Sequence, residues 1–289
     1  MADAMTMTYV ILFIASLWAG TQNALAGGGT FITLPALMLT GMNALQANIT
    51  STIALFPGQV TSTWGGRGHV TGVGGLSFKT LVIVSLTGGI LGAILLLVTP
   101  SKIFAQMVPW LVLFATAIFA YGSFMPRKAD RPPVLNKWGA GIAQFGIAVY
   151  GGYFGGGIGF LMLAALTAAG LSIRNASANK NVLAGVMNAS AVAIFIFSPQ
   201  VQWLPCAIAC VGAAIGGWIG GNMVSKVNEK FLRIAAVCIG VALTIGLFIR
   251  AAAYPQHGWF QIFGCVSGVT GLPPIIIIRM VRHFCPECN

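Results

Sequence analysis

Two glycine triplets suggest a site that binds an anion. Residues 27–29 and 155–157 each stand directly before an apolar segment. Glycine costs about 1 kcal/mol relative to alanine inside a helix, so each triplet should interrupt one helix and let another begin after it. The first N–H groups of that second helix have no partner within the helix, and the positive end of its dipole lies there. Two such helix ends facing one cavity would bind a negatively charged group.

A polar cluster follows each triplet at a similar spacing. The clusters span residues 41–52 and 170–181, and their amides and hydroxyls could replace the hydration shell of an oxyanion. One triplet alone would suggest close helix packing, and one polar residue alone a hydrogen bond between helices. The paired arrangement favours a binding site instead. The candidate substrate-binding residues are Gly28, Gly29, Thr30, Asn48, Thr50, Ser51, Gly156, Gly157, Arg174, Asn175, Ser177, Asn179 and Lys180, with Thr33, Thr52, Asn181 and Asn188 nearby.

The distribution of charged residues favours an anionic ligand over a cationic one. The four acids of the chain are Asp3, Asp130, Glu229 and Glu287. None of them falls in an expected membrane segment, where proton pumps and cation carriers usually keep a carboxylate. Arg174 and Lys180 do fall near membrane depth, and a buried cation needs a partner, which an anionic substrate would supply. The alternative is that both side chains reach the membrane surface.

Other classes of function have little support. We find no Ser-His-Asp set, Walker loop or metalloprotease motif, so we expect no enzyme, no cofactor and no catalytic metal. Cys285 and Cys288 form one C-x-x-C pair, a weak zinc or redox signal without a second pair. The net charge of +11 comes from basic residues in short loops, which predicts membrane orientation and no nucleic-acid partner.

These residues are carried by an all-α polytopic membrane protein, as composition predicts. The 289-residue chain is 57% hydrophobic and 7% charged, whereas a soluble domain is about 25% charged. Residues 81–98 and 103–125 contain no charged residue, and uncharged apolar runs of about 18 residues or more are typical of membrane-spanning helices. Membrane lipid is therefore an expected partner, and the sequence leaves a homo-oligomer open.

The chain also contains an internal repeat. Aligning the triplets, and then Gly41 with Gly170 after one inserted residue, brings Ala47 opposite Ala176. The repeat divides the chain into residues 1–127, residues 128–252 and an apolar tail, 253–289. Each half should form a first helix, a long block and two further helices. The long blocks, 29–64 and 157–199, would greatly exceed a hydrocarbon core of about 30 Å as straight helices. Each block should therefore bend within 43–52 or 172–181, giving about eight to ten membrane segments.

The basic residues favour a re-entrant hairpin in each half. If each long block returns to the side it entered, each half makes an odd number of crossings and the two halves are inverted repeats. Only Lys102 and Arg250 then lie on the outer side, a strong positive-inside bias. The inner side carries Arg67, Lys79, Arg127, Lys128, Arg131, Lys137, Lys226, Lys230 and Arg233. If each long block instead crossed the membrane once, the 226–233 loop would lie on the side opposite the other basic loops.

These motifs resemble those of the sulfite exporter TauE/SafE family, also called the four-toluene-sulfonate uptake family. The resemblance covers about residues 8–250 and depends on ALAGGGTFITLP (24–35) with QANITSTIAL (46–55), and on GGYFGGGIGFLMLAAL (151–166) with NASANKNVLAGVMN (175–188). It implies a multi-pass inner-membrane transporter of small sulfur-containing anions such as sulfite, sulfonates or sulfoacetate. The tail after Arg250 departs from this pattern.

We therefore expect a secondary transporter that works by alternating access around a central site. The alternative is an anion channel or small-solute pore, which would conduct without saturation. A third hypothesis, a membrane redox protein using Cys285 and Cys288, predicts loss of activity when they are replaced by serine.

Overall fold

The computed structural model describes residues 2–25, 27–64, 70–73, 75–124, 135–223 and 229–253. Within these residues it is all-helical apart from one isolated bridge between Val73 and Leu76. The helices are α1 (Ala2–Leu25), α2 (Thr30–Met38), α3 (Ala44–Trp64), α4 (Phe78–Val98), α5 (Ser101–Phe124), α6 (Lys137–Tyr153), α7 (Ile158–Ala168), α8 (Ile173–Phe195), α9 (Trp203–Met223) and α10 (Glu229–Ala253). The apolar tail, with Cys285 and Cys288, lies outside the described residues.

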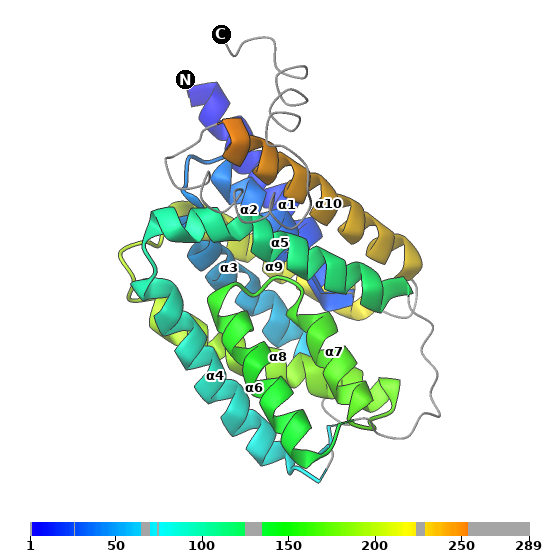
Figure 1. Ribbon diagram of the computed structural model, residues 1–289. Coiled ribbons are helices and arrows are strands. Elements are labelled where there is room, and N and C mark those ends of the chain that lie inside the picture. The colour runs from blue at the N-terminus through cyan, green and yellow to red at the C-terminus, as the bar shows by residue number, and fades with distance from the viewer. Residues whose placement is uncertain are drawn as a thin grey trace, which may run out of the picture.

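The helices form two sets of five, α1–α5 and α6–α10. In each set the second helix, α2 or α7, is short. Their packing also recurs. Helix α1 packs on α9 as α6 packs on α4, and α3 packs on α9 as α8 packs on α4. Helices α4 and α9 thus each pack mainly on the other half of the chain (Figure 1). This recurrence agrees with an internal repeat, whereas the inversion of the halves across a membrane stays a prediction.

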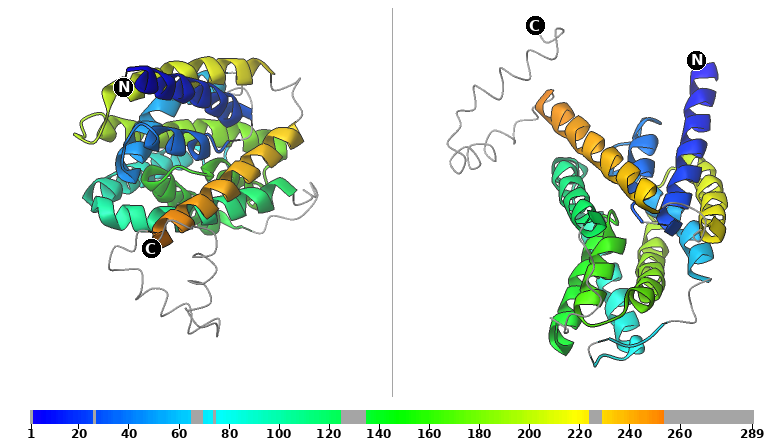
Figure 2. Two further views of the ribbon diagram at one scale, coloured as in Figure 1. Left: turned by 90° about the horizontal axis from the view of Figure 1, so that it is seen from above. Right: turned by 90° about the vertical axis from the view of Figure 1, so that its right-hand side faces the viewer.

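Helices α5 and α10 lie side by side across the ends of the other helices (Figure 2). The indole of Trp110 in α5 meets the ring of Phe248 in α10 edge to face, with 5.1 Å between the ring centroids. These are the last helices of the two halves, so the two halves also meet through corresponding elements.

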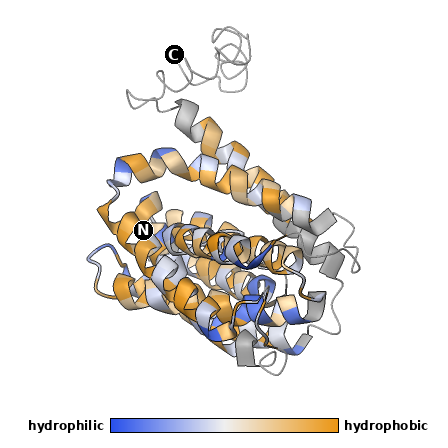
Figure 3. Ribbon diagram, turned by 60° about the horizontal axis from the view of Figure 1, so that its bottom comes forward, coloured by the Kyte–Doolittle hydropathy of each residue, from blue (hydrophilic) through white to orange (hydrophobic). Residues whose placement is uncertain are grey.

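The molecule exposes apolar side chains along most of its helices, as a membrane protein does. Among the described residues, four helices are long and apolar enough to cross a membrane, over Met5–Ala24, Phe78–Val98, Ser101–Ile118 and Trp203–Asn222. Phe197 is 87% exposed and Trp138 is 76% exposed, which would be unusual contact with water but suits contact with lipid. Figure 3 shows apolar residues over most helical surfaces and hydrophilic residues mainly towards helix ends and connections. In the part of the chain that the structure describes, the fold is all-helical and consistent with a polytopic membrane protein.

Both long blocks bend, a few residues before the stretches 43–52 and 172–181 in which we expected the bend. Helix α2 ends at Met38 and α7 ends at Ala168. The chain then turns at Gly41 (φ +93°) and Gly170 (φ +97°). Both have a positive φ, a backbone conformation that glycine adopts readily and other residues rarely do. The remainder of each cluster, from Ala44 and from Ile173, forms the first turns of α3 and α8.

Capping explains why the clusters are helical. The side chain of Asn43 accepts a hydrogen bond from the N–H of Gln46, whose side chain accepts one from the N–H of Asn43. Ser172 accepts in the same way from the N–H of Asn175. Polar residues at the start of a helix supply the partners that its first N–H groups lack.

Glycines set the closest helix contacts. A side chain on Gly216 of α9 would clash with the carbonyl oxygen of Leu17 in α1, and one on Gly92 of α4 would clash with the carbonyl oxygen of Val149 in α6. Small residues allow helices to approach this closely in lipid. We call α1 with α9, and α4 with α6, the crossed pairs, because each joins one half of the chain to the other. Both crossed pairs thus depend on glycines that let the two backbones touch.

A candidate anion-binding pocket

A polar pocket lies where the two broken segments approach each other. Its volume is about 40 Å³, with room for on the order of three water molecules or one small solute. Both halves of the chain contribute to it, through α1, α2 and α3 on one side and α7 and α8 on the other. It is lined by Asn23, Gly27, Gly28, Thr30, Thr52, Leu55, Gln59, Gly155, Ile158, Gly159, Lys180, Asn181, Ala184 and Asn188.

The two short helices begin at this pocket. Thr30 is the first residue of α2 and Ile158 the first of α7, and both line the pocket. Gly29 and Gly157 precede them and provide no side-chain cap. The N-termini of both helices are therefore at the pocket, where the positive ends of two helix dipoles favour negative charge.

Lys180 is the cation among the lining residues, and no acid is among them. Lys180 is only 9% exposed, although its side chain ends in an ionisable amine. It passes beside Gly159 of α7, where an added Cβ would lie 3.6 Å from the lysine Cδ and 3.9 Å from Nζ. A Cβ on Gly159 would also lie 4.0 Å from the Cα of Gly27, so these three residues meet at one end of the pocket.

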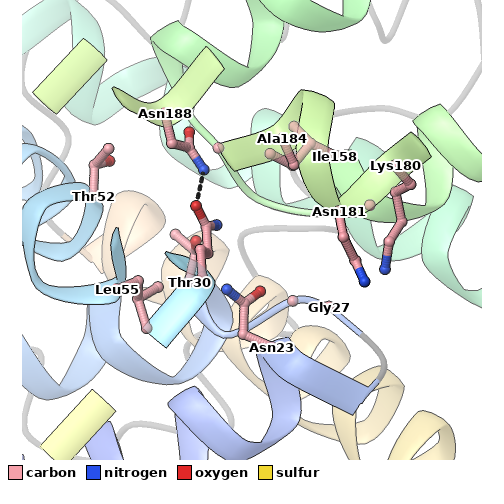
Figure 4. A pocket seen from close by; sticks show the side chains of 14 residues that line it. Asn23, Gly27, Thr30, Thr52, Leu55, Ile158, Lys180, Asn181, Ala184 and Asn188 are labelled. Atoms are coloured by element: carbon pink, nitrogen blue, oxygen red, sulfur yellow. Dashed lines mark hydrogen bonds between the residues drawn. The ribbon is translucent and has the colours of Figure 1, made fainter. Parts of the chain in front are cut away.

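Amide side chains join the two halves across the pocket. The Nδ2 of Asn188 in α8 donates a hydrogen bond to the Oε1 of Gln59 in α3, at 2.7 Å. The Oδ1 of Asn188 is buried and has no partner in the described part of the chain. Figure 4 shows Thr52 and Leu55 on one side of this pair, with Lys180 and Asn181 on the other.

Three of the thirteen candidate residues line the pocket, namely Gly28, Thr30 and Lys180. The other glycines lie against neighbouring helices or rings. A Cβ on Gly29 would meet the carbonyl of Ala19, one on Gly156 would meet the ring of Phe154, and one on Gly157 would contact Ala115. These glycines shape the loops that carry the pocket residues.

Most of the remaining candidates make contacts outside the pocket. Asn48 donates to the carbonyl oxygen of Tyr153 at 3.0 Å, and Ser51 hydrogen-bonds Thr33. Asn179 bonds both backbone groups of Thr71. Thr50 is fully buried, and its hydroxyl has no partner in the residues described. Asn175 and Ser177 lie half-buried in the first turns of α8, and the Arg174 side chain is outside the described set.

Two polar side chains of the pocket were not considered from the sequence, those of Asn23 and Gln59. Asn23 lies before the first glycine triplet, and Gln59 lies beyond the first polar cluster. A signal for Gln59 did exist, because it occupies the position in α3 that Asn188 occupies in α8 when Ala47 is aligned with Ala176.

The alignment of the triplets and that of Ala47 with Ala176, which differ by one inserted residue, together relate most of the pocket wall. Five positions in the first half that line the pocket have a counterpart in the second half that also lines it. The pairs are Gly27 with Gly155, Thr30 with Ile158, Thr52 with Asn181, Leu55 with Ala184 and Gln59 with Asn188. The backbone follows the pattern, since φ is +81° at Gly27 and +78° at Gly155.

A metal site is not apparent in the part of the chain that the structure describes, where His, Cys, Asp and Glu form no cluster of three. The pocket offers amide and hydroxyl groups, which both donate and accept hydrogen bonds, together with the amine of Lys180 and two helix N-termini. Such a set suits a small anion.

Comparison with known proteins gives the same class of protein. The chain is 29% identical over 267 residues to a probable membrane transporter protein, ORF9, of Sinorhizobium sp, covering 89% of this chain and 97% of the relative. It is 30% identical to a probable membrane transporter protein of Haemophilus influenzae, covering 87% and 96%. It is 27% identical to the probable membrane transporter protein YfcA of Escherichia coli K12, covering 86% and 90%.

No solved structure gives a significant match. The sequence profile of the family described as sulfite exporter TauE/SafE matches residues 12–247, which include every helix from α2 to α9 and the whole pocket. This chain, a membrane protein, belongs to the sulfite exporter TauE/SafE family.

Proposed function

We propose that the protein is a secondary transporter of small sulfur-containing anions, such as sulfite, sulfonates or sulfoacetate, in the cell inner membrane. The observation that carries this proposal is the buried Lys180 in a pocket without an acidic lining residue. A buried ammonium group attracts an anion strongly because the surroundings screen it poorly. The family name supports sulfite as one candidate substrate.

Transport in this proposal proceeds by alternating access. Residues 1–127 and 128–252 act as two inverted repeats, and the pocket lies between them because each repeat supplies one wall. Movement of one wall relative to the other would open the pocket to each side of the membrane in turn. The membrane potential alone can set the direction, since moving one charge through 100 mV is worth about 2.3 kcal/mol.

The test is transport into proteoliposomes with a panel of labelled sulfite, sulfonates and carboxylates. We expect saturable uptake of at least one sulfur oxyanion. Lys180→Met should raise KM about tenfold or more, because it removes a charge that is buried beside the anion. The matched control is Lys102→Met, the same substitution at an exposed lysine of α5, which should leave transport unchanged.

Two results would contradict the proposal. Flux that rises linearly with concentration and never saturates would indicate the alternative, an anion channel or small-solute pore. If the Lys180→Met variant transported every anion at the wild-type rate, the pocket would not lie on the transport path.

A further inference from the structure

Helix α3 contains a proline within the stretch that lines the pocket. Thr52 and Leu55 line the pocket before Pro57, and Gln59 lines it after Pro57. Proline has no backbone N–H, so the carbonyl group four positions earlier, that of Ile53, loses the donor that an intact helix would supply. The course of α3 at this point therefore determines where Gln59 lies relative to the rest of the wall.

A thiol from the other half of the chain supplies a donor at this carbonyl. The Sγ of Cys210 in α9 donates to the carbonyl oxygen of Ile53, with 3.9 Å between the two atoms. In membrane helices, groups on neighbouring helices take over the backbone positions that a proline leaves without a partner. The thiols of Cys206 and Cys210 also hydrogen-bond each other. Because a thiol both donates and accepts, Cys210 can serve both neighbours.

The second half of the chain has no proline at the corresponding place. Val186 of α8 corresponds to Pro57 of α3 when Ala47 is aligned with Ala176. Valine keeps its backbone N–H, so α8 can form the hydrogen bond that α3 lacks at this turn. The wall that α8 contributes to the pocket therefore needs no donor from another helix.

The helix that packs on α8 has no cysteine at the corresponding place either. Gly89 of α4 lies against α8 as Gly217 of α9 lies against α3, so these two glycines correspond. Aligning them places Val82 of α4 opposite Cys210 of α9. In the α3–α9 pair a proline and a thiol thus occur together, whereas the α8–α4 pair has valine at both positions.

We infer that Cys210 positions the pocket wall, because its thiol replaces the N–H that is missing at Pro57 and fixes the course of α3 there. Gln59, two residues beyond the proline, is thereby held where it accepts the 2.7 Å hydrogen bond from Asn188 across the pocket. Cys210 is not among the residues that line this pocket, so its effect passes through α3. The inference rests on the proposed function and extends it from the residues at the pocket to one that positions them.

The first experiment measures sulfite transport into proteoliposomes. Cys210→Val, which introduces the residue found in α4, should raise the KM about fivefold, because the buried Ile53 carbonyl loses the thiol that donates to it. Cys210→Ser should keep the KM within about twofold, since a hydroxyl also donates. In a Pro57→Ala background, which restores the N–H, Cys210→Val should change the KM by less than about twofold. Cys238→Val, at an exposed cysteine of α10, is the matched control and should leave transport unchanged.

A second experiment tests the hydrogen bond without transport. Infrared spectra are compared for two variants, one that keeps Cys210 and one that keeps Cys238 as its only cysteine. The S–H stretching frequency of Cys210 should be the lower of the two, because its thiol donates to a carbonyl whereas that of Cys238 is exposed. Adding Pro57→Ala should raise the Cys210 frequency, because the new N–H competes for the Ile53 carbonyl.

The inference is overturned if Cys210→Ser impairs transport as strongly as Cys210→Val, or if Cys210→Val has the same effect with and without Pro57. Should Cys210→Val fail to fold, Pro57→Ala should restore folding in the double variant, and failure in both backgrounds would also overturn the inference. A wild-type protein that takes up no sulfur oxyanion would contradict the proposed function, whereas equal S–H frequencies for Cys210 and Cys238 would contradict the positioning role itself.

Discussion

Asn179 stands directly before Lys180, yet its side chain is used to hold a loop. Its Oδ1 accepts a hydrogen bond from the N–H of Thr71 at 3.0 Å, and its Nδ2 donates to the carbonyl oxygen of Thr71 at 2.7 Å. Asn179 itself is fully buried. Neighbouring residues of a helix point in directions about 100° apart, so adjacent positions serve the pocket and the loop separately.

We predict that Asn179→Ala destabilises the protein without weakening anion binding. Two side-chain hydrogen bonds are lost, at about 1 kcal/mol each, so the free energy of unfolding should fall by about 2 kcal/mol. The measurement is thermal unfolding of the solubilised protein together with sulfite binding. Asn175→Ala, a half-buried asparagine on the same helix, is the control. A loss of binding with unchanged stability would show that Asn179 contacts the substrate after all.

At the scale of helices, some glycines allow two helix backbones to touch, whereas others face open space. Gly216 of α9 lies against the backbone of α1, where a side chain would clash with the Leu17 carbonyl, whereas Gly146 of α6 has nothing within 4 Å of an added Cβ. The same substitution should therefore have opposite effects at the two positions.

Gly216→Ala should greatly reduce the amount of folded protein, because the backbones of α1 and α9 would have to separate. Gly146→Ala should leave the yield unchanged or improve stability by up to about 1 kcal/mol, the difference in helix propensity. Size-exclusion chromatography of the detergent-extracted variants measures both. Equal yields of the two variants would mean that the α1–α9 contact is not as close as described.

The existence of these helices could be predicted from the sequence more readily than their ends. Apolar runs and the length limit of a membrane segment indicated the helices and the two bends. The bends were expected within 43–52 and 172–181, but Asn43 and Ser172 act as caps, so the residues after them are helical. The pocket was harder to predict, because Gln59 and Asn188 meet only once α3 and α8 are packed together.

For the whole molecule, the sequence predicts which loops share a side of the membrane. With re-entrant hairpins, Lys137 and Asn222 lie on one side, and Lys102 and Gln202 lie on the other. With single crossings of the long blocks, Lys137 would instead share a side with Gln202. All four side chains are exposed and lie near helix ends or in a connection, so they are suitable for chemical labelling.

We expect single cysteines at 137 and 222, in a variant without the native cysteines, to react from the cytoplasmic side only. Cysteines at 102 and 202 should react from the opposite side, because the basic loops remain inside. Labelling of intact cells with a membrane-impermeant thiol reagent measures this. Joint labelling of 137 with 202 would rule out the inverted arrangement.

The crossed pairing of α1 with α9 and α4 with α6 also governs how the chain is made. Helix α1 is synthesised well before α9, which carries the glycine-lined surface on which α1 packs. Until α9 is made, α1 has its smaller contacts with α2 and α3, and its apolar length lets it stay in the bilayer. Final assembly is therefore a late event in biogenesis, and a chain truncated before α9 would leave α1 without its largest packing partner.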